Sequence, residues 1–324
     1  MGWFRPAEGS RVKVVIPGGS GQVGTVLARA LVADGHDVVV LSRAPQPAPW
    51  RVVVWDAEKV GPWAAELDGA DAVVNLAGRS VNCRYGAANR RLILDSRVRS
   101  TTAVGDAIRR AARPPRVWLQ MSTATIYAHR FDAANDEATG LLGGAEDAPD
   151  TWRFSIDVAT AWERAATEAA TPHTRTVLLR TAMVMSPDRG GVFDTLLGLV
   201  RRGLGGTSGD GRQFVSWIHE RDFVRAVTWL IDHPGLSGPV NLSAPEPLPN
   251  RDFMAALRAA WGTRLGLPAA RWMLAVGAWL LRSETELILK SRRVVPGKLL
   301  ASGFGFDFPA WPAAAAELCR RWRA

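Results

Sequence analysis

Short apolar runs alternate with longer amphipathic stretches through the first half of the chain. Six runs are rich in β-branched residues and almost wholly apolar, which is typical of strands covered on both faces; they span 12–16, 37–41, 52–55, 72–76, 117–121 and 176–180. Between the first two runs, residues 22–34 place their apolar side chains on one helical face and end before Gly35. This alternation predicts βαβ units, and therefore a parallel sheet with helices on both faces.

After residue 180 the pattern becomes looser and predicts a smaller lobe, with a helix at 193–202, a strand at 214–218, a helix at 220–231 and a strand near Val240. From Asn250 onward the chain is mostly helical in pattern. The apolar segment 272–281 is half as long as a membrane span, which needs about 20 residues, and we interpret it as a core helix.

We therefore expect an α/β fold, a Rossmann-like doubly wound parallel sheet with a smaller, mostly helical C-terminal lobe. The predicted domains are 1–185, to which later segments return, and 186–324. The composition, with 47% hydrophobic and 22% charged residues among 324, is that of an ordinary globular protein.

The net charge of +9 raises the possibility of nucleic-acid binding. Only four of the 40 basic residues are lysines, and the arginines are scattered in runs of at most two. A nucleic-acid site would need a basic stripe interleaved with aromatic residues, so we expect no nucleic-acid partner. The N-terminus lacks the apolar segment of a secretory signal, which predicts a cytoplasmic protein with no membrane partner. Cys83 and Cys319 are far apart and indicate neither a disulfide framework nor a metal site.

The strongest local motif follows the first predicted strand and opens a predicted helix. It satisfies both G-x-x-G-x-x-G and G-x-G-x-x-G, and consists of Gly18, Gly19, Ser20, Gly21, Gln22, Val23 and Gly24. Glycines permit tight turning and a close approach of backbone N–H groups to a pyrophosphate, and the helix N-terminus adds partial positive charge. We expect this loop to hold the diphosphate of a dinucleotide; a tight turn without a ligand is the alternative.

The second strand ends in Leu41, Ser42 and Arg43, where an NAD-selective site would place Asp or Glu. An arginine and a serine are better suited to a 2′-phosphate, so we predict NADP(H) as the cofactor. A solvated loop position is the alternative for Arg43. The fourth strand runs into Leu76, Ala77 and Gly78, small or apolar residues at the carboxyl end of a parallel strand, where ligands bind.

Taken together, these motifs resemble the extended short-chain dehydrogenase/reductase superfamily, and more narrowly its atypical branch of nucleoside-diphosphate-sugar epimerase homologues with a helical C-terminal domain of unassigned role. The resemblance covers nearly the whole chain and includes 18–24, 42–43, 73–78, 95–97, 203–219, 236–241 and 250–253. It implies that the glycine loop contacts NADP(H) together with Ser42, Arg43, Leu76, Ala77, Arg97 and Val184. One departure is Pro17, where the superfamily commonly has threonine.

The catalytic Tyr-x-x-x-Lys pair of that superfamily is missing. The chain has two tyrosines, and the residues four positions after Tyr85 and Tyr127 are asparagine and phenylalanine. Aligning the following helix on Glu163 places Ser155 and Ala159 where the tyrosine and lysine would stand. The atypical branch also lacks the pair, so its absence fits the resemblance while casting doubt on ordinary dehydrogenase chemistry.

Three residues are candidates for catalysis. Thr123 matches the superfamily position of the catalytic Ser or Thr, and Tyr127 follows closely as a proton donor, although a pocket wall with a satisfied hydroxyl is the alternative. His219 is a candidate acid in a segment that faces the substrate in the superfamily, with a histidine bonded to backbone at a helix start as the alternative. Candidate substrate contacts are Ser122, Arg212 and Trp217.

Two functions remain open at this point. The first is an NADP(H)-binding oxidoreductase or epimerase-like enzyme that acts on a small carbonyl or sugar-like substrate. The second is a non-catalytic NADP(H)-sensing protein, which the missing Tyr-x-x-x-Lys pair favours. The polar residues retained at Thr123, Tyr127 and His219 favour the enzyme. The substrate and the oligomeric state do not follow from the sequence.

Overall fold

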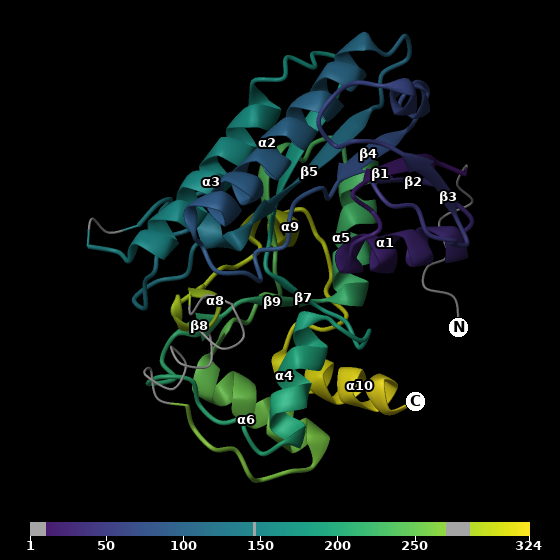
Figure 1. Ribbon diagram of the computed structural model, residues 1–324. Helices are drawn as coiled ribbons and strands as arrows, with labels where there is room; N and C mark the ends of the chain where they lie inside the picture. Colours follow the sequence, from purple (N-terminus) through teal and green to yellow (C-terminus); the bar gives the residue numbers. More distant parts are fainter. Residues whose placement is uncertain (1–10, 145–146, 270–285) are drawn as a thin grey trace.

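A computed structural model describes residues 11–144, 147–269 and 286–324 of the chain. Within these residues, seven parallel strands form one sheet in the order β10-β6-β5-β4-β1-β2-β3 (Figure 1). The strands are β1 (Lys13–Pro17), β2 (Asp37–Ser42), β3 (Arg51–Val54), β4 (Ala72–Asn75), β5 (Val117–Thr123), β6 (Arg175–Thr181) and β10 (Gly238–Leu242). The strand order reverses between β1 and β4, so the predicted Rossmann-like sheet is confirmed and its ligand crevice is expected at this point.

Helices cover both faces of the sheet, as Figure 1 shows. One face packs against α1 (Gln22–Ala33), α5 (Glu220–Asp232) and α9 (Gly297–Ala301), and the other against α2 (Ala87–Arg110), α3 (Asp150–Thr167) and the short 3₁₀ helix η1 (Pro62–Glu66). Alternate residues of β1 point to opposite faces: Val14 and Ile16 join the first core, and Val15 the second. This two-sided burial is the physical reason for the continuous apolar runs in the sequence.

A smaller lobe lies beyond the sheet and has a core of its own around Trp217, Phe253 and Trp311. Its helices are α4 (Val192–Arg201), α6 (Asn250–Trp261) and α10 (Trp311–Arg323). Two short sheets accompany them, formed by β7 (Met183–Met185) with β9 (Trp217–His219) and by β8 (Phe214–Val215) with β11 (Leu248–Pro249). The helix α8 (Glu286–Leu289) lies between this lobe and the sheet (Figure 1).

Two expectations about the second half of the chain need correction. The strand expected near Val240 is β10, which pairs with β6 and so belongs to the main sheet. The helix expected at 220–231 is α5, which packs on that sheet in the same core as Val240 and not in the smaller lobe. The single strand expected at 214–218 is two strands separated at Ser216, whose hydroxyl donates to the carbonyl oxygen of Arg292. The predicted core helix at 272–281 lies outside the described residues.

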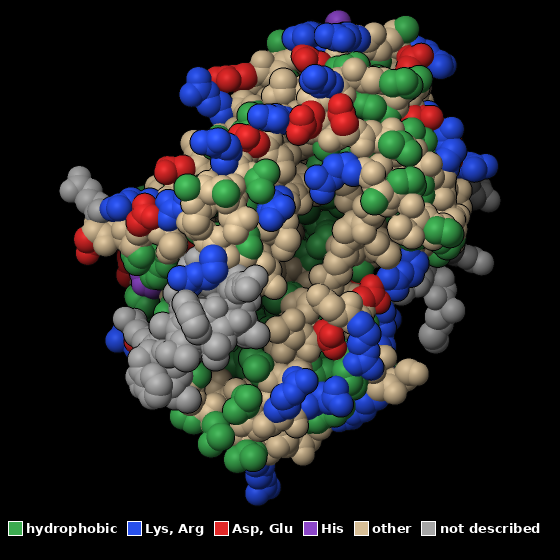
Figure 2. Space-filling view, viewed as in Figure 1, with side chains coloured by type: hydrophobic (Ala, Val, Ile, Leu, Met, Phe, Trp, Pro, Cys, Tyr) green, Lys and Arg blue, Asp and Glu red, His purple; other side chains and the backbone are tan. Residues whose placement is uncertain are grey.

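The molecular surface agrees with the scattered arginines of the sequence. Figure 2 shows Lys and Arg side chains spread over the visible face and intermixed with Asp and Glu. The same face is hollowed between the main sheet and the smaller lobe. Among the helices of the described residues, none combines the length and the apolar character that a membrane crossing requires.

Candidate functional site

The glycine loop joins β1 to α1, and two of its glycines allow close backbone approaches. A Cβ added to Gly18 would lie 2.6 Å from the Cα of Ala77, and one added to Gly24 would lie 2.5 Å from the Cα of Gly19. Gly18 also has a φ of +75°, which side chains of L-residues rarely adopt. A Cβ added to Gly21 would meet only the carbonyl oxygen of Gly18, at 3.6 Å. Gly18 and Gly24 therefore serve internal packing, whereas Gly21 leaves room for a ligand.

The N-terminus of α1 is suited to an anion. Gly21 is its N-cap and contributes no side-chain hydrogen bond, and the first turn contains no acidic residue. The side-chain Nε2 of Gln22, the first helical residue, is buried and has no hydrogen-bond partner among the described residues. The N–H groups of a first helical turn need external acceptors, and a buried unpaired amide needs one too. A diphosphate would supply acceptors to the N–H groups of this turn, whereas the Gln22 amide lies against Gly191 at the start of α4.

The end of β2 lies beside this loop. The backbone N–H of Gly18 donates to the carbonyl oxygen of Leu41 at 2.9 Å, and the hydroxyl of Ser42 donates to that of Ser20 at 3.0 Å. Ser42 is buried, whereas Arg43 is exposed directly after it. The structure thus places Ser42 and Arg43, the residues expected at the 2′-phosphate, beside Ser20 of the glycine loop.

The segment after β4 forms the other side of the crevice. The backbone N–H of Leu76 donates to the carbonyl oxygen of Pro17 at 2.8 Å, and that of Ala77 donates to the side chain of Asn75 at 3.1 Å. Gly78 lies against α2, where a Cβ on it would be 3.3 Å from Cζ of Arg97. The structure therefore brings Leu76, Ala77, Gly78 and Arg97 together next to the glycine loop, as the sequence predicts.

Tyr127 and Ser122 belong to a buried network with Glu163, Arg180 and Asn241. Ser122 Oγ donates to Glu163 Oε1 at 2.6 Å, and Arg180 Nη2 donates to Glu163 Oε2 at 2.8 Å. The Tyr127 hydroxyl donates to Asn241 Oδ1 at 2.9 Å and accepts from Arg180 Nη1 at 3.1 Å. Burial raises the pKa of Tyr127. Both side chains already have protein partners, so the arrangement favours the alternative of a satisfied hydroxyl for Tyr127.

His219 is fully buried as the N-cap of α5. Its Nδ1 accepts the backbone N–H of Arg221 at 3.1 Å, so the proton is on Nε2, which lies 3.0 Å from Glu317 Oε2. The ring also stacks on Phe308, with 3.9 Å between ring centroids. Both ring nitrogens are thus occupied at a helix start, which is the structural alternative that the sequence left open.

Three further candidates lie away from Thr123. Trp217 is buried in the lobe core with its ring centroid 5.0 Å from that of Trp311. Arg212 is exposed, with its guanidinium 5.7 Å from the ring centroid of Phe131. Val184 is buried on β7. None of these three lines the cavity into which Thr123 faces.

That cavity has a volume of about 120 Å³ and lies at the carboxyl end of β5. Thr123 is partly buried there, and its Oγ1 accepts the backbone N–H of Thr125 at 3.2 Å. The polar and charged residues of the lining come from four separate parts of the chain; they are Tyr85, Arg97, Thr123, Thr125, Ser155, Glu286 and Arg292. Ser155, which the alignment places at the family tyrosine position, is therefore part of the site.

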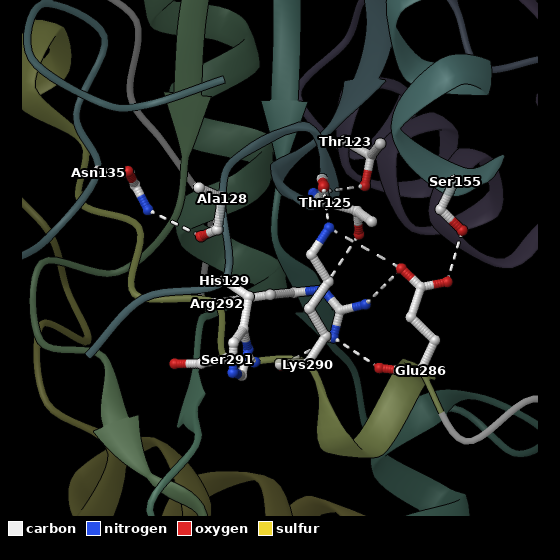
Figure 3. Close-up of polar contacts among 10 residues, drawn as sticks. All are labelled: Thr123, Thr125, Ala128, His129, Asn135, Ser155, Glu286, Lys290, Ser291 and Arg292. Atoms are coloured by element: carbon white, nitrogen blue, oxygen red, sulfur yellow. Dashed lines mark hydrogen bonds and ion pairs between the residues drawn. The ribbon is translucent and has the colours of Figure 1, made fainter. Parts of the chain in front are cut away.

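The residues that sequence reasoning missed form a polar cluster around Glu286, drawn in Figure 3. Ser155 Oγ donates to Glu286 Oε2 at 2.5 Å, and Oε1 of the same carboxylate is 3.7 Å from Arg292 Nη2 and 4.0 Å from Lys290 Nζ. Lys290 Nζ donates to the carbonyl oxygen of Thr125 at 2.7 Å, and Arg292 Nε donates to Thr125 Oγ1 at 3.1 Å. The C-terminal region thus contributes three charged side chains to the end of β5.

One weak signal for this polar cluster is present in the sequence. No lysine occurs between Lys59 and Lys290, so Lys290 is an isolated lysine in a chain that otherwise uses arginine. Its side chain is 1% exposed, which is rare for a lysine. Glu286 and Lys290 stand four positions apart, but the groups to which they are hydrogen-bonded, Ser155 and Thr125, lie more than 100 positions earlier in the chain, and no spacing in the sequence points to those two.

Lys290 is expected to titrate about two units below an ordinary lysine. Burial, reinforced by the adjacent Arg292, lowers its pKa to about 8, compared with about 10.4 in an unfolded chain. Between these values the folded chain binds fewer protons at this site than the unfolded chain, so the contribution of Lys290 to stability rises with pH across that window. NMR titration of the ¹³C-lysine-labelled protein, assigned through Lys290→Arg, should give a midpoint near 8. A midpoint near 10.4 would contradict the burial argument.

Comparisons with known proteins cover the whole site. The profile of the NAD dependent epimerase/dehydratase family matches residues 14–242, and that of DUF1731, a domain of unknown function, matches residues 269–318. The epimerase family protein SDR39U1 of Homo sapiens is 32% identical over 310 residues, covering 95% of this chain and 99% of that protein. The epimerase family protein YfhF of Bacillus subtilis is 29% identical over 300 residues, covering 92% and 94%. The crystal structure of the human protein with NADPH has a TM-score of 0.82 at 31% identity, covering 95% of this chain and 99% of that one.

Proposed function

Because this chain belongs to the NAD dependent epimerase/dehydratase family, we propose that it binds NADP(H) and is an oxidoreductase or epimerase-like enzyme for a small carbonyl or sugar-like substrate. The main support is the glycine loop, where Gly21 leaves room for a ligand at the N-terminus of α1. A diphosphate would fill that space and accept hydrogen bonds from the N–H groups of the first helical turn. The similar human protein was crystallised with NADPH.

The 2′-phosphate of NADP(H) would be held by Arg43 and Ser42 at the end of β2. Arg43 is exposed beside the buried Ser42, so its guanidinium can reach a phosphate from the solvent side of β2 without displacing a partner among the described residues. The diphosphate would lie on the N-terminus of α1, over Gly21. Arg97, Leu76, Ala77, Gly78 and Val184 are the further cofactor contacts that we propose.

Replacing Arg43 with alanine should weaken NADPH binding about tenfold, the loss of about 1.4 kcal/mol expected when a charge-assisted phosphate contact is removed. The affinity for NADH should be unchanged because NADH lacks the 2′-phosphate. Nicotinamide fluorescence titrations measure both constants. Arg109→Ala, which removes an equally exposed arginine from α2, is the matched control and should leave both constants unchanged. Equal losses for NADPH and NADH would contradict the assignment.

The bound nicotinamide would supply or accept a hydride at a substrate carbon. The protein's own part is to manage the proton on the substrate oxygen. The Thr123 hydroxyl accepts a backbone N–H and can donate its own proton to that oxygen. Ser155 donates to the Glu286 carboxylate. When Ser155 Oγ accepts a proton from a substrate hydroxyl, it can therefore pass its own proton to Glu286. Lys290 and Arg292 are positioning residues that keep Glu286 charged and oriented.

The second candidate function is NADP(H) sensing without catalysis. It is favoured because the polar atoms of Tyr127 and His219, two candidate proton donors, are already bonded to the buried side chains of Asn241 and Glu317. The two functions separate in one experiment, in which the NADPH-loaded protein is mixed with a panel of carbonyl compounds and NADPH absorbance is followed. Turnover supports the enzyme, tight binding without turnover supports the sensor, and failure to bind NADPH contradicts both.

A further inference from the structure

The cavity beside Thr123 contains an excess of positive charge. Its charged lining consists of Arg97, Arg292 and Glu286. The carboxylate of Glu286 is already engaged by Ser155, by Arg292 and by Lys290, the buried lysine behind it. Among the described residues, the lining therefore has two arginines and one carboxylate, and that carboxylate is paired with Arg292 and Lys290 and not with Arg97.

Arg97 is the cation of this wall that no acidic group balances among the described residues. Its Nη1 donates to the carbonyl oxygens of Arg79 and Ile93 at 3.0 and 3.1 Å, and its guanidinium lies 4.8 Å from the ring centroid of Trp162. Within the part of the chain that the structure describes, it forms no ion pair with a carboxylate. Burial lowers the pKa of Arg97 to about 10. Carbonyl dipoles and an aromatic ring offset only part of the cost of burying the positive charge of a guanidinium. An anionic ligand would supply the missing negative charge.

The rest of the cavity limits the size and character of such a ligand. Its volume is about 120 Å³, and an apolar cavity of about 150 Å³ accommodates benzene, so a group slightly smaller than benzene, of about five non-hydrogen atoms, fits. Val81, Ile93 and Phe154 form an apolar part of the wall. The hydroxyls of Thr123 and Ser155 lie in the same lining, where they can contact a carbonyl or hydroxyl oxygen.

We propose that this cavity binds the carboxylate end of a small acidic substrate, with the anion held by Arg292 and Arg97 and its neighbouring carbonyl or hydroxyl carbon placed at Thr123 and Ser155. This assignment of substrate class rests on the proposed function. The geometry of Arg292 suits it, because Thr125 Oγ1 holds its Nε and the carbonyl oxygens of Glu286 and Lys290 hold its Nη1, which fixes the guanidinium plane in the cavity lining. The C-terminal region would then determine which substrate the sheet domain accepts.

The first test compares acidic probes with neutral ones of the same shape. After NADPH binding has been measured, the NADPH-saturated protein is titrated by calorimetry with pyruvate and with 2,3-butanedione, in which a methyl group replaces one oxygen of the carboxylate and removes its charge. The same comparison is made for 2-oxobutyrate and 2,3-pentanedione. We expect each acid to bind at least tenfold more tightly than its neutral counterpart, and added salt to weaken only the acids. Equal affinities, or no binding of either acid at tens of millimolar, would overturn the proposal.

The phosphates of NADPH are the other source of negative charge near Arg97. Saturating the protein with NADPH first separates the two sources. If the cofactor alone neutralises the cavity, the acids will not bind to the loaded protein and the proposal fails. If NADPH does not bind while the acids do, the proposed cofactor is wrong and the acid site stands.

The second test uses variants of the C-terminal region. Arg292→Gln should weaken pyruvate binding at least tenfold and leave the NADPH constant unchanged, and Arg292→Lys, which keeps the charge without the planar fork, should recover part of the loss. Arg293→Gln removes the same charge one residue later, from a side chain that contacts Phe131 and Phe214, and should leave pyruvate binding unchanged. Equal losses in Arg292→Gln and Arg293→Gln would contradict a specific role for Arg292. If Arg292→Gln does not fold, the acid and neutral probes on the natural protein still decide the question.

Discussion

Replacing Glu163 with glutamine is expected to lower the free energy of unfolding by about 3–5 kcal/mol, the usual cost of removing one partner from a buried ion pair. The side chains of Glu163 and Arg180 are 11% and 6% exposed, and Arg180 donates two hydrogen bonds of 2.8 Å to the two carboxylate oxygens. An amide keeps the shape of the carboxylate but leaves the guanidinium without a counter-charge. The hydrogen bonds that hold Ser122 and Tyr127 would be disturbed as well, because Ser122 donates to Glu163 and Tyr127 accepts from Arg180.

Urea unfolding followed by circular dichroism measures this loss. The matched control is Glu168→Gln, which makes the same chemical change just beyond the C-terminus of α3 in an exposed pair with Arg164. That control should cost at most about 0.5 kcal/mol, because exposed pairs are screened by solvent. A Glu163→Gln variant that is no less stable than the control would show that the buried network contributes little to the fold.

Replacing Gly21 with valine is expected to weaken NADPH binding tenfold or more while lowering the free energy of unfolding by about 1 kcal/mol, the usual cost of an apolar residue at a helix N-cap. Gly21 has φ of −73° and ψ of 169°, an extended conformation that valine also adopts. A Cβ there meets only the carbonyl oxygen of Gly18, at an ordinary contact distance of 3.6 Å. The added side chain therefore projects into the space that a diphosphate would occupy, without straining the protein.

Gly24→Ala, in the same loop, should mainly lower the stability of the protein. Its Cβ would lie 2.5 Å from the Cα of Gly19, so the backbone must move, at a cost of about 1–3 kcal/mol. Fluorescence titration with NADPH and urea unfolding of the two variants provide the comparison. A Gly21→Val protein that binds NADPH normally would remove the diphosphate from this loop and with it the main support for the proposed function.

The fold prediction from sequence is confirmed where the pattern is local. Strands such as β1 and β2 are continuous apolar runs because both faces are covered. The glycine loop is recognisable because three glycines within seven residues, Gly18, Gly19 and Gly24, each lie too close to other backbone atoms to carry a side chain. The return of β10 to the main sheet was harder to predict. Its residues are as apolar as those of a strand in either lobe, and only pairing with β6 places it.

The candidate site divides in the same way. The cofactor side, from Gly18 to Gly78, follows from residues close to strand ends, because carboxyl ends of neighbouring parallel strands meet at one edge. The catalytic side does not. Tyr127 and His219 are polar residues in the expected segments, but their partners Asn241 and Glu317 lie 114 and 98 positions away.

The sequence by itself therefore determined the parallel sheet, the dinucleotide loop and the preference for a 2′-phosphate, since each depends on residue types within a few positions of one another. The tertiary structure alone decided which polar groups face the cavity. It joined Ser155 to Glu286 across 131 positions and buried Lys290 against Thr125 across 165. The physical reason is that a charged side chain is buried only where the folded chain supplies its partners, and those partners are chosen by the path of the chain through space and not by spacing along it.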